Sequence, residues 1–105
     1  MNQASFNQRM LPHNPQAEKS VLGAMLLNNR SILTVTEILD EADFFKSSYQ
    51  IIFRESLVLF KDTGVLDQIR LVDHLKEMDL LKTCGGASII SALTDDIPST
   101  AHVKN

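Results

Sequence analysis

The fold is decided by residues 47–62, SSYQIIFRESLVLFKD. Apolar side chains recur there every three or four residues, which is the period of one face of an α-helix. The face that points to the core is expected to consist of Tyr49, Ile52, Phe53, Leu57 and Phe60. Ile51, Val58 and Leu59 widen the apolar surface beyond this face. A helix with so wide an apolar surface lies either at the centre of a bundle or half in a bundle and half in an interface.

Residue types that begin or end helices stand on both sides of this segment. Ser47 and Gln50 have the spacing of a capping box, and Gly64 is typical of the residue that follows a helix. Asp67 can cap a second helix, which is predicted over residues 68–78. The buried face of that helix is expected to consist of Ile69, Leu71, Val72 and Leu75.

The glycine pair Gly85–Gly86 breaks the chain before a short helix predicted over residues 87–95. Its inner side is expected to hold Ile89, Ile90 and Leu93. Pro98 and Ser99 are a further helix-start signal close to the end of the chain. We therefore expect the sequence to stop inside a further helical element.

Two helices are predicted upstream. Asn14 and Pro15 start the first, which should run to about Asn28 with Glu18 and Lys19 pointing away from the core. Its core face is expected to consist of Ala17, Val21, Leu22, Met25 and Leu26.

The next helix is predicted from Asn29, which can cap it, to about Glu41. Its apolar stripe is expected to consist of Ile32, Val35, Ile38 and Leu39. Residues 43–45, Asp-Phe-Phe, are predicted to form a turn whose aromatic pair fills the core. Together these patterns predict an all-α fold, a small bundle of about five to six helices. Residues 1–13 lack apolar periodicity and are expected to form a flexible N-terminal arm, followed by one helical domain over residues 14–105.

Composition limits the classes of function. The chain has 105 residues, ten basic against thirteen acidic, and a net charge of -3. A domain that binds DNA normally presents a basic face, so we expect no direct binding of nucleic acid. Cys84 is the single cysteine, which favours a reducing compartment. No signal peptide or membrane span is apparent, and we expect a cytoplasmic protein.

The sequence offers little chemistry. Its four glycines allow neither GxxxxGK[ST] nor GxGxxG, and its three histidines lack the spacing of paired metal ligands, which indicates ordinary surface histidines. Cys84 has no neighbouring base that would make it a nucleophile, and acidic pairs such as Asp95–Asp96 are expected to be solvated. We therefore predict no catalytic residue, metal site or cofactor in this chain.

Several motifs nevertheless occur together in order. LPHNPQAEKSVLGAMLL spans residues 11–27, DFF follows at 43–45, and a Gly-Gly pair precedes Pro98–Ser99. In this order and spacing the chain resembles the N-terminal domain of bacterial replicative DNA helicases of the DnaB family. One departure is that the family often has GGxxYL, whereas Ile89 and Ile90 occupy the last two positions here.

The resemblance implies a hexameric ring helicase whose N-terminal domains form a collar and recruit primase. It implies that this chain is a non-catalytic interaction domain, ending as a helical hairpin begins near Ser99. The parent would be an ATP-dependent DNA helicase, with ATP and Mg bound only by an ATPase domain absent from this chain. The expected partners are other helicase subunits and primase, and a helicase loader is a further candidate.

Two other functions remain open: a free-standing helical adaptor of another pathway and a small enzyme. The enzyme needs converging titratable groups in a pocket, and the sequence supplies dispersed ones. The adaptor requires a parent gene without an ATPase. The candidate interface residues are Ile51, Val58 and Leu59 on the back of the central helix and Ile89 beside the Gly-Gly turn, if the bundle does not bury them.

Overall fold

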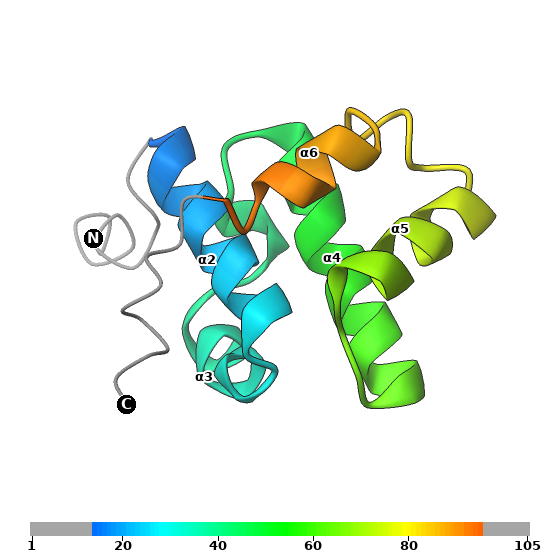
Figure 1. The fold of residues 1–105 in the computed structure, drawn as a ribbon. Coiled ribbons are helices and arrows are strands. Elements are labelled where there is room, and N and C mark those ends of the chain that lie inside the picture. The colour runs from blue at the N-terminus through cyan, green and yellow to red at the C-terminus, as the bar shows by residue number, and fades with distance from the viewer. Residues whose placement is uncertain (1–13, 96–105) are drawn as a thin grey trace.

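A computed structural model describes residues 14–95, which form a helical bundle (Figure 1). Its elements are α2 (Pro15–Leu27), α3 (Arg30–Ile38), the 3₁₀-helix η1 (Glu41–Asp43), α4 (Ser47–Thr63), α5 (Gln68–Glu77) and α6 (Ala87–Ala92). No strand occurs within residues 14–95, so the predicted all-α class is confirmed. The predicted arm and the helix start at Pro98–Ser99 lie outside the described residues.

Helix α4 occupies the centre of the bundle, as its wide apolar surface predicts. It contacts α2 on one side and α5 on the other, and η1 packs against its N-terminal half (Figure 1). The core contains Phe44 and Phe53, whose rings contact each other at a tilt of 37° with their centroids 4.9 Å apart. The other buried apolar residues come from all the α-helices and from the segments that follow or join them: Leu22, Met25, Leu26, Ile32, Leu39, Tyr49, Ile52, Leu59, Leu66, Leu71, Leu75, Cys84, Ile90 and Leu93.

Three of the predicted helix boundaries have the expected cause. The Asn14 side chain accepts hydrogen bonds from the backbone N–H of Gln16 and Ala17 at 2.9 and 3.4 Å, which caps α2. Asp67 likewise accepts a bond from the N–H of Arg70 at 2.8 Å at the start of α5. Gly64 ends α4 with φ +78°, a conformation that side chains with a Cβ adopt at a cost.

The predicted capping box at Ser47 and Gln50 is wrong. The N-cap of α4 is Lys46, without a side-chain cap bond, and Gln50 instead donates from Nε2 to the carbonyl of Phe44 at 2.7 Å. A capping box is present one element earlier, where the backbone N–H of Asp40 donates to Asp43 Oδ2 at 2.8 Å. Spacing alone did not distinguish these two sites.

The helix predicted from Asn29 to about Glu41 is shorter than expected, since α3 ends at Ile38. Asn29 does not cap it with its side chain. The Asn29 amide instead bonds both the N–H and the C=O of Leu66, at 2.9 and 2.8 Å, and so ties α3 to the loop before α5. Similarly, α6 ends at Ala92 rather than at Asp95.

Three aromatic or aliphatic residues predicted to be buried are exposed. One of them is Ile38 of the predicted stripe on α3, which is 54% exposed. Phe44 is buried, but Phe45 is 68% exposed, so only one of the pair fills the core. Ile69, expected on the inner face of α5, is 75% exposed. It lies in the first turn of α5, where no helix of the described bundle covers it.

The Gly85–Gly86 turn needs both its glycines. Their φ angles are +102° and +91°, which L side chains rarely adopt. A Cβ at Gly85 would also meet Cγ1 of Ile89 at 2.5 Å. The turn therefore presents α6 at an angle that only this small pair allows, with Ile89 lying over Gly85.

Candidate protein-interaction surface

The predicted interface residues differ in exposure. Val58 is 41% exposed, Ile51 and Ile89 are half-buried, and Leu59 is only 8% exposed. Leu59 therefore belongs to the core, which corrects the expectation that the free domain leaves it exposed. Ile51 and Val58 are seven residues apart on α4 and so share one face, whereas Ile89 lies on α6. Their part in binding stays a prediction.

A groove runs between α3 and α4. It consists of two adjoining cavities of about 540 and 410 Å³ that share Thr36, Leu57 and Lys61. The larger cavity is lined in addition by Ile32, Leu33 and Phe60, and the smaller by Leu39, Asp40, Glu41, Phe53, Arg54 and Val58. We call these two cavities together the α3–α4 groove. Its rim carries exposed apolar residues, and its floor consists of buried core residues.

The charges of the groove are unevenly distributed. Lys61 is exposed, and no ion pair or hydrogen bond of its ammonium is found within the described part of the chain. Arg54, in contrast, is held by Glu41 at 3.3 Å and by Glu55 at 3.0 Å. One end of the groove thus carries Asp40 and Glu41, and its shared middle carries an unpaired cation.

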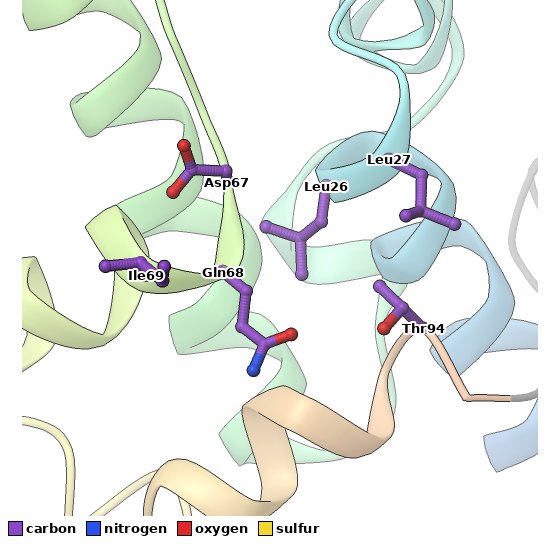
Figure 2. Close-up of a pocket in the computed structure, with 6 residues that line it drawn as sticks. All are labelled: Leu26, Leu27, Asp67, Gln68, Ile69 and Thr94. Atoms are coloured by element: carbon purple, nitrogen blue, oxygen red, sulfur yellow. The ribbon is translucent and has the colours of Figure 1, made fainter.

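A separate cavity, of about 440 Å³, lies where α2 ends and α5 begins (Figure 2). Leu26, Leu27 and Thr94 form one side of it, and Asp67, Gln68 and Ile69 form the other. Leu27 and Ile69 are exposed, and the Asp67 carboxylate is paired with Arg70. This cavity accounts for the unexpected exposure of Ile69, which lies at its rim. Both surfaces offer apolar side chains without converging catalytic groups.

Glu18 has a structural role that the sequence did not reveal. It was expected to point to solvent, yet it is 1% exposed. Its Oε2 and Oε1 accept hydrogen bonds from the backbone N–H of Phe45 and Lys46, at 3.0 and 3.4 Å. The carboxylate thus binds the N–H groups of Lys46, the N-cap residue of α4, and of Phe45 just before it, as an external cap at the end of the helix where the dipole favours negative charge. The Asp-Phe-Phe motif directly before α4 was the signal that could have pointed to it.

Glu55, His74 and Arg54 form a second polar cluster, between α4 and α5. His74 Nε2 lies 2.8 Å from Glu55 Oε1, and Arg54 Nε donates to Glu55 Oε2 at 3.0 Å. Burial favours a higher pKa for the Glu55 carboxyl, but the hydrogen bonds from His74 and Arg54 outweigh it and hold that pKa below its usual value. His74 is therefore a partner of a buried carboxylate, not the surface histidine that was expected. His13 and His102 lie outside the described residues.

The remaining chemical candidates show no activated arrangement. Burial raises the pKa of the Cys84 thiol, which favours the unreactive protonated form. Within residues 14–95, no three His, Cys, Asp or Glu side chains are grouped so as to hold a metal ion. The helices of this part of the chain are too short or too polar to cross a membrane.

Comparison with known proteins connects this fold to a family. The profile described as DnaB-like helicase N terminal domain matches residues 10–105. The replicative DNA helicase DnaB of Treponema pallidum (strain Nichols) is 39% identical over 94 residues, 89% of this chain. The replicative DNA helicase DnaC of Bacillus subtilis (strain 168) is 32% identical over 99 residues, 94% of this chain. The chain spans about a fifth of their lengths, 21% and 22% respectively.

A solved structure agrees with the family profile. The crystal structure of the N-terminal domain of DnaB helicase from Mycobacterium tuberculosis matches with a TM-score of 0.76 and 31% sequence identity. The match covers 86% of this chain and 65% of that one. The resemblance based on the ordered motifs is confirmed by these independent matches of sequence and fold. The chain belongs to the DnaB-like helicase N-terminal domain family.

Proposed function

We propose that this chain is a non-catalytic interaction domain of a replicative DNA helicase, which supports hexamer assembly and recruits primase at the replication fork. The observation that carries the proposal is the presence of exposed apolar residues along the α3–α4 groove and along the cavity between α2 and α5, in a chain of acidic net charge. Desolvated apolar anchors are what protein interfaces need, whereas DNA needs a basic face.

The contact residues proposed for this function are Ile51, Val58 and Ile89, with Leu59 excluded by its burial. The partners are other helicase subunits and primase, and a helicase loader is a further candidate. ATP and Mg are proposed to bind to the motor domain of the parent protein, and the place of action is the bacterial cytoplasm. The names of the relatives, which are replicative DNA helicases, support this assignment.

Deletion of the domain from the parent protein tests the proposal. A parent lacking residues 14–95 should still hydrolyse ATP, because we assign that chemistry to the motor. It should lose most of its hexamer in native mass spectrometry and most of its stimulation of primer synthesis by primase. A parent that has no ATPase activity even when complete would instead indicate the adaptor, and unchanged hexamer and priming after deletion would refute the interaction role.

A further inference from the structure

We infer that the α3–α4 groove binds an amphipathic helix of a partner protein, with two apolar side chains in the two cavities and an acidic side chain beside Lys61. This inference rests on the proposed function, since it specifies one partner surface of an interaction domain. It concerns the groove alone and does not involve the cavity between α2 and α5.

The dimensions of the groove suit a helix. The cavity linings on α4 extend from Phe53 to Lys61, and a helix rises 1.5 Å per residue, so they span roughly 12 Å. Apolar residues at positions i and i+7 of an incoming helix are separated by about 10 Å, and a helix that binds a groove places anchors at this spacing. Each cavity has its own buried apolar floor, Ile32 in the larger and Phe53 in the smaller.

The rim of the groove is apolar where the incoming helix would lie. Leu33 from α3 and Val58 from α4 are both exposed, although each lines a cavity whose floor is core. Covering these side chains would remove apolar surface from water, which favours association. The apolar contacts therefore provide the affinity.

The charges select the occupant and its direction. Lys61 lines both cavities, and its ammonium group has no ion-pair partner within residues 14–95. An Asp or Glu of the incoming helix would therefore pair with it. Arg54 cannot serve the same purpose, because Glu41 and Glu55 already hold it. At the other end of the groove Glu41 is engaged by Arg54, so Asp40 is the carboxylate that favours the positive N-terminal end of the incoming helix dipole. A basic helix or a nucleic acid phosphate backbone fits this arrangement less well.

Selection from a displayed library of helical peptides tests the inference, with the full 105-residue chain as bait. The recovered peptides should share apolar residues at i, i+3 or i+4, and i+7, together with an Asp or Glu. Leu33→Asp and Val58→Asp should each lower the affinity for a recovered peptide at least tenfold, as measured by fluorescence anisotropy. Amide chemical shifts of the bound chain should change along α3 and α4.

A charge exchange gives the sharpest outcome. Lys61→Glu should lower the affinity for the same peptide several-fold. A peptide whose acidic residue is changed to Lys should bind well to the Lys61→Glu chain but not to the original chain. Lys76→Glu, an exposed cation on α5, is the matched control and should leave binding unchanged. Thermal melting by circular dichroism checks that each variant is folded.

Three results would overturn the inference: failure to recover any such peptide, binding that maps to the α2–α5 cavity, or indifference to Lys61→Glu. Self-association of the chain that Leu33→Asp abolishes would assign the groove to a second copy and would also contradict it. If only these tests fail while deletion of the domain still abolishes priming, the proposed function stands and the groove is not the contact.

Discussion

At the scale of single residues, the buried Glu55 carboxylate connects two helices. His74 of α5 lies 2.8 Å from one Glu55 oxygen, and Arg54, which neighbours Glu55 on α4, donates to the other at 3.0 Å. A buried carboxylate without these partners would be costly, because burial penalises its charged form. Glu55 and His74 therefore connect α4 and α5, and we call this pair the polar clamp. The polar clamp stabilises the fold only while Glu55 is ionised.

The clamp predicts a pH dependence of stability. The pKa of Glu55 is lower in the folded chain than its ordinary value, which is about 4.3 in an unfolded chain, so its contribution is present above that value. The contribution is lost as the pH falls through the lower pKa of the folded state. We expect Glu55→Gln to cost roughly 1 to 3 kcal/mol near neutral pH, since it leaves a weaker buried hydrogen bond.

Urea unfolding of both proteins at pH 7 and pH 3 measures this effect. The difference in the free energy of unfolding between the original chain and Glu55→Gln should shrink at the lower pH. A difference that stays constant, or that grows on acidification, would show that ionised Glu55 is not what stabilises the pair.

At the scale of elements, α4 depends on a residue of another helix for its start. Glu18 from α2 accepts bonds from the N–H groups of Phe45 and Lys46, and Lys46 offers no side-chain cap of its own. Helix starts leave their first N–H groups unpaired unless a side chain or water binds them. The same Glu18 hydrogen bonds thus hold α2 against α4 and stabilise the start of α4.

Removal of this cap should be costly. Glu18→Ala removes the buried carboxylate that accepts from the N–H groups of Phe45 and Lys46, and we expect a loss of roughly 1 to 3 kcal/mol in the free energy of unfolding. Lys19→Ala is a neighbouring substitution on the same helix that leaves the cap in place. Chemical denaturation followed by circular dichroism measures both, and a loss below about 0.5 kcal/mol for Glu18→Ala, the usual range of surface changes, would show that the cap is dispensable.

The sequence predicted the elements better than their partners. Helical spacing, the caps at Asn14 and Asp67, and the glycines at 64, 85 and 86 are local signals, and the helices begin close to the predicted positions. The buried cap Glu18 depends on contact between residues that are 27 or more positions apart, which periodicity does not report. The role of His74 was missed for the same reason.

The candidate surface was predicted only in part. Helical periodicity identified Val58 as a residue outside the main core face, which agrees with its exposure. It could not separate Val58 from its neighbour Leu59, because the position of α5 and the loops decides which apolar residue is covered. The exposure of Ile69 and the α3–α4 groove likewise follow from how separate helices meet.

At the scale of the whole molecule, the central claim is that this domain acts through its apolar surfaces. The most direct test combines Val58→Glu and Ile69→Glu in the complete parent protein. Val58→Glu places a charge in the α3–α4 groove, and Ile69→Glu places one at the cavity between α2 and α5. These residues are 41% and 75% exposed, so the free energy of unfolding of the domain should change by less than about 1 kcal/mol.

The measurement is the rate of primer synthesis by primase in the presence of the parent helicase, with the hexamer followed in the same samples by native mass spectrometry. The account predicts that the double variant keeps a folded domain and an active ATPase, yet stimulates primase at least tenfold less or no longer forms a stable hexamer. Full stimulation together with an intact hexamer would contradict it.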